Sequence, residues 1–296
     1  MLVLWLVVIL GAVAAGVVGS SRRESNILLN ARVRTVARYA AESGIVAGVA
    51  LVEHRMATAY SPAQRVFAFA ALDREFADLR ELPLGNGRFA VALTNLNARL
   101  DLNQADPEAL VGLFSQFAPP AAARAVVDAL QDWRDADDLV RAEGAESDAY
   151  LRAGSPYVPR NAPLTRLDEF RRVRGVTESL ALAVAPYVTV YGDWRIDINA
   201  APESVLAAVP GIGTVNARAV VSRRSAGGVF ASVSEVESFL GPASWPLLPR
   251  LAVAPSRLLL VSRGWMPGHP LTHEVQAAYA VVGQRLRLQS WREWDR

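Results

Sequence analysis

The chain has 296 residues, of which 52% are hydrophobic and 20% are charged, and its formal net charge is +2. This length is enough for a sizeable core or for two domains, and the balance is that of an ordinary globular protein. Every basic residue is an arginine, which argues against a lysine-rich tail that binds nucleic acid. With no cysteine and three histidines, disulfides, thiolate zinc sites and a cysteine nucleophile are excluded, and histidine chemistry is sparsely supplied.

The N-terminal 21 residues carry no charge, and the first 19 are almost wholly apolar. As a helix, such a stretch rises roughly 28 Å, close to the thickness of the hydrocarbon core of a bilayer. A single segment in lipid must satisfy its backbone internally, so it must be helical. A cleaved signal peptide and a buried soluble helix are the alternatives, but the stretch is longer than a signal core and has no basic region before it. We therefore expect residues 1–21 to span a membrane.

The same helix is expected to continue beyond the membrane. From Glu24 to about Met56 the sequence contains no proline, and apolar residues recur at helical spacing with charged residues between them. One apolar stripe of this second half should pack on a globular body. Gly44 and Gly48 lower the local helix propensity and would allow a bend.

Strand patterns lie on either side of a long helical region. A turn at residues 85–87 precedes alternating apolar residues, and a short strand over 98–102 fits as the hairpin partner of that run. Three further strand-like runs follow near the C-terminus: residues 258–261, 273–282 and 284–291. Between them, residues 103–255 have a helical pattern with frequent proline and glycine. We therefore predict an α+β fold, in which one small antiparallel sheet is interrupted by a helical domain.

Two segments of the helical region resemble each other. Residues 99–110 and 195–206 both run from a short extended stretch with Asp and Asn into a Pro-Glu pair. Proline suits the first turn of a helix, and glutamate complements the positive end of the helix dipole. Either a duplication or a recurrent helix cap explains the likeness, so the repeat predicts structure rather than chemistry.

The segment Val-Pro-Gly-Ile-Gly-Thr at residues 209–214 has the form of a helix-hairpin-helix turn, with a weaker copy at 167–177. The backbone N–H groups of such a turn can bind phosphate, provided that basic residues are in local excess. Arg218, Arg223 and Arg224 supply some positive charge. Acidic residues lie close to them in sequence: Asp193, Asp197, Glu203, Glu235 and Glu237. We therefore favour a structural hairpin, and a membrane-tethered DNA-binding protein is the alternative.

Seven carboxylates fall within the 17 residues 132–148, around a glycine. Calcium prefers carboxylate and carbonyl oxygens on a flexible loop, but the spacing is not that of an EF-hand. A solvated acidic loop explains the pattern equally well, and Arg134 and Arg141 offer partial relief of the repulsion. On the residues alone, both interpretations stay open.

The sequence contains no nucleophile elbow, no metal-binding histidine pair and no phosphate-binding Gly-Lys-Ser/Thr motif. His269 and His273 are four residues apart, but Pro270 between them disfavours a helix that presents both, so we expect them in a surface loop. We therefore predict that the chain is not an enzyme. Aromatic residues near the C-terminus can mark a contact surface, but core packing is the more common fate of tryptophan, so we give contact no more than equal weight. They are Trp265, Trp291 and Trp294.

Taken together, several segments resemble the K-type minor pseudopilin of bacterial type II secretion systems (the GspK family). The most specific are the Asp-Trp-Arg-Asp-Ala-Asp block at 132–137 and the Ile-Asn-Ala-Ala-Pro block at 198–202. The resemblance implies a pilin-like body, with a long N-terminal helix, a small antiparallel sheet and a large all-α, helix-hairpin-helix-like domain inserted in it. The matching division of this chain is residues 1–21, 22–102, 103–255 and 256–296.

The resemblance also implies a role. Family members are single-pass proteins of the bacterial inner membrane with the body in the periplasm. They lie at the tip of the pseudopilus, help initiate its assembly and so support export of folded periplasmic proteins. The implied partners are the I-type and J-type minor pseudopilins, the major pseudopilin, the inner-membrane secretion platform and, if a leader exists, a prepilin peptidase. Nucleic acid is not among them.

Two details of the family bear on this sequence. Most pseudopilins carry a Glu at the fifth mature position, whereas the first acidic residue here is Glu24, as suits a tip subunit that has no neighbour to pair with such a buried charge. The helical domain of the family can bind calcium, and the resemblance directs attention to five acidic residues as ligands. They are Asp132, Asp135, Asp137, Glu143 and Glu146.

Overall fold

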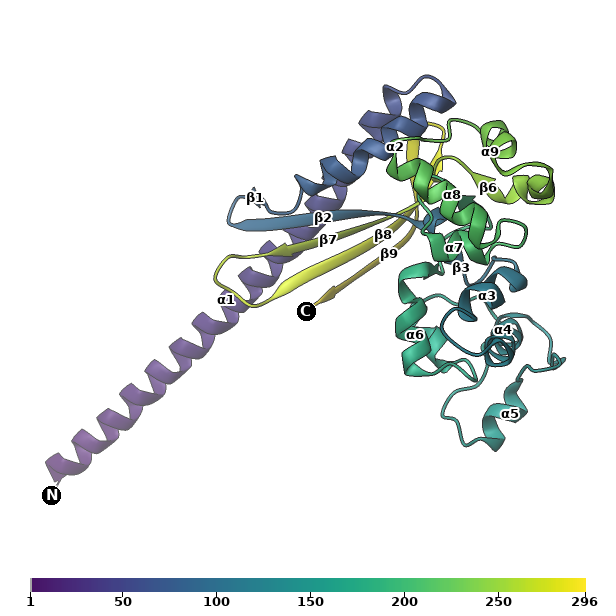
Figure 1. Ribbon diagram of the computed structural model, residues 1–296. Coiled ribbons are helices and arrows are strands. Elements are labelled where there is room, and N and C mark those ends of the chain that lie inside the picture. Colours follow the sequence, from purple (N-terminus) through teal and green to yellow (C-terminus); the bar gives the residue numbers. More distant parts are fainter. Residues whose placement is uncertain (1) are drawn as a thin grey trace.

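The computed structural model describes residues 2–296. It consists of a long N-terminal helix, an antiparallel sheet packed on the second half of that helix, and a helical domain beside the sheet (Figure 1). The side chains at 7–8, 15–23, 25, 73 and 243–244, and those before Trp5, lie outside the description. The predicted membrane segment, residues 1–21, therefore falls partly outside the described side chains.

Helix α1 spans Leu2–Ala57, 56 residues without interruption, which confirms the single long helix. Its first half projects away from the body (Figure 1), and its described apolar side chains there, such as Trp5 and Ile9, are exposed. Among the residues whose side chains are described throughout, Asn26–Ala57 is long and apolar enough to cross a membrane by length and composition, although 39% of its most apolar stretch is buried in the protein.

The glycines of α1 serve close packing. A Cβ on Gly44 would lie 2.1 Å from Ser262 Oγ, and a Cβ on Gly264 of the facing strand would lie 2.2 Å from the Ala37 carbonyl oxygen. The helix and the sheet can approach this closely only because both positions lack side chains. The helix runs on through Gly44 and Gly48.

The sheet has the strand order β1-β2-β7-β8-β9, and every neighbouring pair is antiparallel. Its strands are β1 Leu82–Leu84, β2 Gly87–Asn95, β7 Arg257–Trp265, β8 Thr272–Val282 and β9 Arg285–Asp295. One face packs on α1 and on helix α2 (Pro62–Ala77) around buried residues such as Ile45, Leu72 and Leu260. The predicted interrupted antiparallel sheet is thus confirmed.

The predicted hairpin partner at 98–102 is wrong. That segment forms a 3₁₀ turn, η1 (Leu96–Ala98), and a two-residue strand, β3 (Leu100–Asp101), which pairs in parallel with β4 (Val188–Thr189). The side chain of Asn95 accepts a hydrogen bond from the backbone N–H of Asn97 and turns the chain out of the sheet. Strand β2 instead pairs with β1 and β7.

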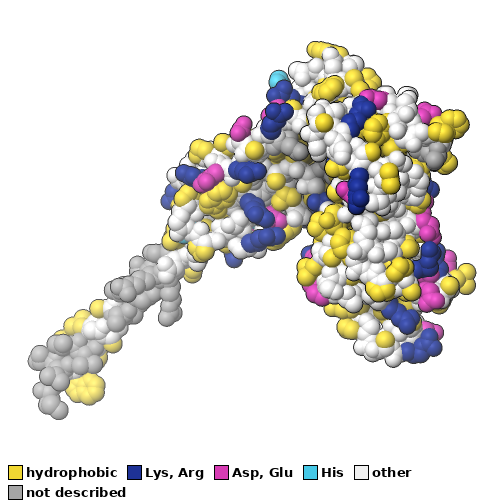
Figure 2. All heavy atoms as spheres, in the orientation of Figure 1, with side chains coloured by type: hydrophobic (Ala, Val, Ile, Leu, Met, Phe, Trp, Pro, Cys, Tyr) yellow, Lys and Arg dark blue, Asp and Glu magenta, His cyan; other side chains and the backbone are white. Residues whose placement is uncertain are grey.

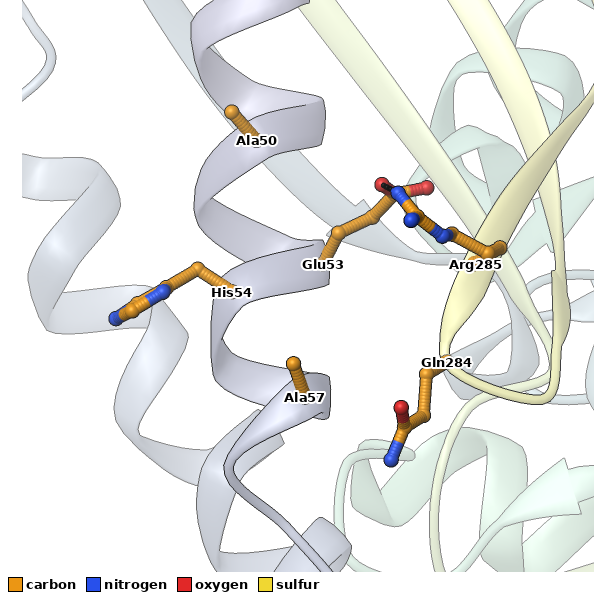
Figure 3. Close-up of a pocket in the computed structure, with 6 residues that line it drawn as sticks. All are labelled: Ala50, Glu53, His54, Ala57, Gln284 and Arg285. Carbon is orange, nitrogen blue, oxygen red and sulfur yellow. Dashed lines mark hydrogen bonds and ion pairs between the residues drawn. The ribbon is translucent and has the colours of Figure 1, made fainter.

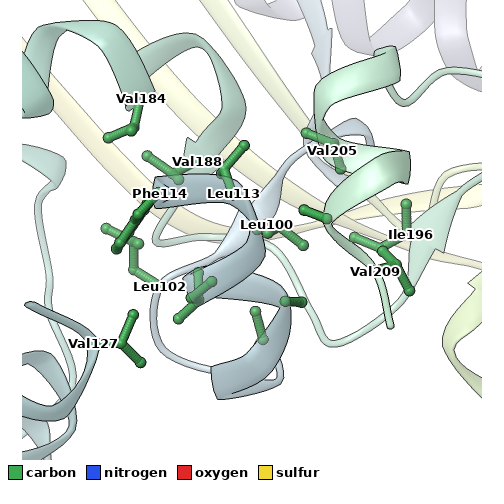
Figure 4. Close-up of a cluster of buried hydrophobic side chains, with 14 of the residues drawn as sticks. Leu100, Leu102, Leu113, Phe114, Val127, Val184, Val188, Ile196, Val205 and Val209 are labelled. Atoms are coloured by element: carbon green, nitrogen blue, oxygen red, sulfur yellow. The ribbon is translucent and has the colours of Figure 1, made fainter. Parts of the chain in front are cut away.

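The inserted domain lies between β2 and β7 and has its own core, part of which is shown in Figure 4. Its longer elements are α3 Pro107–Phe114, α4 Pro120–Arg134, α5 Ser147–Arg152, η2 Leu167–Arg172 and α6 Glu178–Val184. The 3₁₀ turn η3 (Ala185–Tyr187) leads into β4. The second half contains β5 Ile196–Asp197, α7 Glu203–Ala208, α8 Gly213–Ser225, α9 Val233–Leu240, η4 Pro242–Arg250 and β6 Leu251–Ala252.

The sequence repeat corresponds to a repeated local structure. Asp101 Oδ1 accepts the N–H of Asn103 at 2.7 Å, and Asp197 Oδ1 accepts the N–H of Asn199 at 3.0 Å. The amide of Asn103 then bonds the backbone of Leu164, just as that of Asn199 bonds the backbone of Phe230. In each copy the first short strand pairs in parallel with a strand after the last helix. The copies differ chiefly in the long segment 135–163 of the first, which contains the acidic residues.

Candidate functional sites

The acidic segment folds around Asp132 near the end of α4. This side chain is fully buried, and Arg141 Nη1 lies 2.7 Å from Asp132 Oδ1 and also donates to Asp135 Oδ2. A Cβ on Gly144 would lie 1.9 Å from Asp132 Oδ2, so the loop can cover the carboxylate only with a glycine there. The other candidate for relief of the repulsion, Arg134, instead donates to the carbonyl oxygen of Leu102.

Glu146 is the least satisfied acid of the segment. Its side chain is 4% exposed, and neither of its carboxylate oxygens meets a hydrogen-bond partner among the described residues. Burial, followed by repulsion from Asp132 and Asp135, raises the pKa of Glu146 to about 7. Glu146 also lines a surface pocket of about 470 Å³, together with Asp138 and Asp148, which gives a small cation a path to it.

The other two predicted ligands lie at the surface. Asp137 Oδ1 accepts the backbone N–H of Leu139 at 2.9 Å, and exposed Glu143 is held through its backbone N–H by Asp128. Within residues 2–296 as described, no three Asp, Glu or His side chains converge as a ready metal site. Arg141 thus bridges Asp132 and Asp135, and Glu146 lies near enough to both for their charges to raise its pKa, whereas Asp137 and Glu143 lie at the surface.

The helix-hairpin-helix turn is present between α7 and α8, with Gly211 at φ 90° and Gly213 at φ 69°. Its basic residues are engaged within the domain. Arg218 Nε lies 3.0 Å from Glu203 Oε1, Arg223 pairs with Glu235, and Arg224 Nη1 donates to the Ile198 carbonyl at 3.0 Å. On the face in Figure 2, positive and negative side chains are interspersed over this domain. These contacts favour the structural role over phosphate binding.

A groove runs between α1 and the edge strand β9, and we call it the α1–β9 groove. It has a volume of about 610 Å³. Its walls are Glu42, Ile45, Val46, Val49, Ala50, Glu53, Tyr279 and Trp291. Val46, the most exposed apolar residue of the wall, is 68% exposed. At Glu53 the groove meets a smaller pocket, where Arg285 Nη1 lies 2.7 Å from Glu53 Oε2; Gln284 lies on the same side of α1, and His54 points away from this pair (Figure 3).

The predicted surface location of the histidine pair is half right. His269 lies in the loop before β8, whereas His273 is a buried residue of β8 whose Nδ1 lies 2.7 Å from Asp295 Oδ1. Strand β8 is buried at His273 and at the two residues that follow it, because it lies between β7 and β9 in the sheet. Of the C-terminal tryptophans, Trp291 lines the α1–β9 groove and is 39% exposed, whereas Trp265 and Trp294 are half-buried.

The long helix packed on an antiparallel sheet defines a pilin-like subunit, here with a helix-hairpin-helix domain inserted. Comparison with known proteins makes this specific. Residues 87–193 match the family model described as type II secretion system (T2SS), protein K, and residues 192–241 match a helix-hairpin-helix motif. These matches, together with the relatives below, confirm the resemblance to type II secretion system protein K.

Relatives differ in how much of the chain they cover. Type II secretion system protein K of Klebsiella pneumoniae is 26% identical over 231 residues, which are 71% of this chain and 66% of that protein. The protein K of Aeromonas hydrophila is 37% identical over 75 residues, 25% of this chain and 23% of that protein. The alignments therefore span just under two thirds of the first relative and about a quarter of the second.

A solved structure shares the fold. It is the GspK-GspI-GspJ complex from the type 2 secretion system of enterotoxigenic Escherichia coli, with a TM-score of 0.65 and 18% sequence identity. The match covers 92% of this chain and 99% of that one. It confirms the predicted architecture of a pilin-like body with an inserted helical domain.

Proposed function

We propose that this chain is a minor pseudopilin at the tip of a type II secretion pseudopilus. The first half of α1 anchors it in the bacterial inner membrane, and the body lies in the periplasm. There it joins I-type and J-type minor pseudopilins, helps to initiate assembly and so supports export of folded periplasmic proteins. It acts by docking, with no catalytic step.

The exposed apolar surface of α1 carries this proposal. Val46 and Tyr39 are both more than half exposed on the helix that continues into the anchor. Large apolar side chains exposed next to one another indicate an interaction surface. Their burial against a partner would stabilise the complex by about 25 cal/mol per Å² of apolar area. Val46 also lines the α1–β9 groove, which could accept the apolar face of a second amphipathic helix. A chain of the same fold assembles with GspI and GspJ in the solved complex.

The absence of acid from the first 23 residues supports the position at the tip. A carboxylate in lipid requires a partner from a neighbouring subunit, and Glu24 is the first acid of this sequence. A subunit with nothing to pair is suited to the end of the filament. The major pseudopilin and the secretion platform are then expected to act below it.

Co-purification tests the assembly. The full-length chain in detergent is expected to retain both minor pseudopilins. Val46→Arg places a charge in the α1–β9 groove and should weaken the complex at least tenfold, since burying an unpaired charge costs more than about 1.4 kcal/mol. Val215→Arg, at an exposed position on α8, is the matched control and should bind as the unchanged chain does. If Val46→Arg binds both minor pseudopilins as well as Val215→Arg does, docking at this groove is contradicted.

We also propose that the acidic segment binds calcium. The unpartnered oxygens of Glu146 and the buried oxygen Asp135 Oδ1, which lacks a partner among the described residues, fit a hard cation. Asp132, Asp135 and Glu146 would hold the ion, with Asp137 and Glu143 as outer ligands. The bound ion would supply the positive charge that these carboxylates lack.

A thermal melt with and without calcium tests this second proposal. Ligand at 100 times its dissociation constant stabilises the folded state by about 2.7 kcal/mol, so the melting temperature should rise by several degrees. Glu146→Gln should remove most of the rise. An unchanged melting temperature at millimolar calcium would contradict the site, while leaving the assembly proposal to its own test.

A further inference from the structure

Arg141 bridges the carboxylates of Asp132 and Asp135. Its Nη1 donates to Asp132 Oδ1 at 2.7 Å and to Asp135 Oδ2, and its backbone N–H lies 3.3 Å from Asp132 Oδ2. Asp132 is fully buried, whereas the Arg141 side chain is 37% exposed. The guanidinium therefore covers the carboxylates from the solvent side.

This single cation leaves much of the acceptor capacity unused. Asp132, Asp135 and Glu146 supply three carboxylates, and Arg141 contacts two of them. Both oxygens of Glu146 and Asp135 Oδ1 are buried without a hydrogen bond in the described part of the chain. Buried carboxylates are normally paired and hydrogen-bonded. Arg141 thus neutralises part of the negative charge of the acidic segment but leaves three buried carboxylate oxygens without a partner among the described residues.

The surrounding loop allows Arg141 to leave the carboxylates. Arg141 is the first residue of a tight turn in which the Gly144 N–H bonds the Arg141 carbonyl oxygen at 3.0 Å. Arg141 follows the exposed segment 136–140 and lies outside α4, which ends at Arg134, so its side chain can move into water without unfolding that helix. The pocket of about 470 Å³ is lined by Glu146 and by Val140 and Gly144, which lie close to Arg141 in the chain.

We propose that Arg141 is an intramolecular counter-ion that competes with a divalent cation for Asp132, Asp135 and Glu146. In the arrangement seen here, the arginine closes the site. A divalent cation binds when the guanidinium moves out, so Arg141 sets the cation concentration at which the segment changes state. This inference deepens the calcium proposal and rests on it.

The direct test is the calcium dissociation constant, measured by calorimetry on the full-length chain and its variants with Ca²⁺ alone as the probe. If the arginine-free arrangement is populated at about a tenth or less, removing the competitor should tighten binding about tenfold or more. Arg141→Gln should show this gain and a lower melting temperature without calcium. Arg141→Lys keeps the positive charge on a shorter side chain that reaches the carboxylates less well, so it should bind more tightly than the unchanged chain but less tightly than Arg141→Gln.

Arg152→Gln is the matched control, since Arg152 lines the same pocket and donates to the Asp148 carbonyl oxygen. It removes the same charge without vacating the site and should change affinity by less than about threefold, the scale of a screened surface charge. An equal gain in Arg141→Gln and Arg152→Gln would overturn the competition, because it would be a general charge effect. Tighter binding in neither Arg141 variant would also overturn it. Calcium binding by the unchanged chain that becomes at least tenfold tighter in Arg141→Gln, with no gain in Arg152→Gln, would support it.

If Arg141→Gln unfolds without calcium, far-UV circular dichroism during the titration decides the matter. Refolding by calcium supports the competition. The calcium dissociation constant of Arg141→Lys, compared with that of the unchanged chain, then measures how much Arg141 weakens calcium binding. Failure of every variant to bind calcium would overturn both this inference and the calcium proposal. Co-purification with the I-type and J-type pseudopilins is a separate measurement and would still stand.

Discussion

At the scale of single residues, Glu146 should make stability depend on pH. Its folded-state pKa, about 7, lies above its ordinary value of 4.5, so between these values the folded state binds more protons than the unfolded state. Stability should therefore fall as the pH rises from about 4.5 to about 7, by about 1 to 3 kcal/mol. Denaturant unfolding at pH 5 and pH 8, in the presence of a chelator, measures this.

Glu146→Gln provides the comparison. The amide has no charge to lose, so the variant should be nearly as stable at pH 8 as at pH 5 and more stable than the parent at pH 8. A fall of the same size in both proteins would mean that other groups cause the pH dependence. Asp101 and Asp197, whose burial raises their pKa to about 6, are then the next candidates.

The sequence identifies the acidic segment but not which acids converge. Asp132 lies on the buried face of α4, which a helical pattern can indicate, whereas Glu146 is buried only through the loop that folds back over Asp132. That return depends on Arg141 and on a glycine at 144, and nothing in the linear spacing specifies it. Asp137 and Glu143 have the same residue types yet point outward.

At the scale of elements, the contact between α1 and β7 depends on Gly264. A Cβ there would lie 2.2 Å from the Ala37 carbonyl oxygen and 2.3 Å from the Ala41 backbone nitrogen. Gly264→Ala should therefore push the helix off the sheet and lower the free energy of unfolding by about 1 to 3 kcal/mol. Ala92→Val, at an exposed position on β2, adds bulk away from the helix and should change it by less than about 0.5 kcal/mol. Equal stabilities in thermal melts would refute the close-contact argument.

Elements with a strong period were predicted and weaker ones were not. The long helix, β2 and the three C-terminal strands follow from apolar spacing over many residues. The segment 98–102 looked like a strand, but Asn97 redirects the chain. Its amide donates to Asp193 Oδ1 at 2.7 Å and accepts the N–H of Ser256 at 2.9 Å. Asn97 therefore joins the segment that enters the inserted domain to the segment that leaves it. Contacts of such long sequence separation leave no local pattern. Helix α2 was not anticipated, although Ser61 and Gln64 form a capping box at its start.

At the scale of the whole molecule, the described residues form two separate hydrophobic cores. One holds α1 and α2 on the sheet, and the other closes the inserted domain around its two repeated units. Exposed Tyr39 and Val46 of α1 and the α1–β9 groove lie on the pilin-like body, while the acidic segment lies in the inserted domain. The proposed docking surface and the proposed cation site therefore lie in separate parts of the protein, and a variant of one should leave the other intact.

Site-specific cross-linking in living bacteria tests the docking of α1 to its sibling subunits most directly. A photoreactive amino acid at position 46, in the α1–β9 groove, is predicted to form a covalent product with the I-type or J-type minor pseudopilin. The same probe at position 215, on the exposed surface of α8, should give neither product. Products with those pseudopilins from position 215 and none from position 46 would contradict the account.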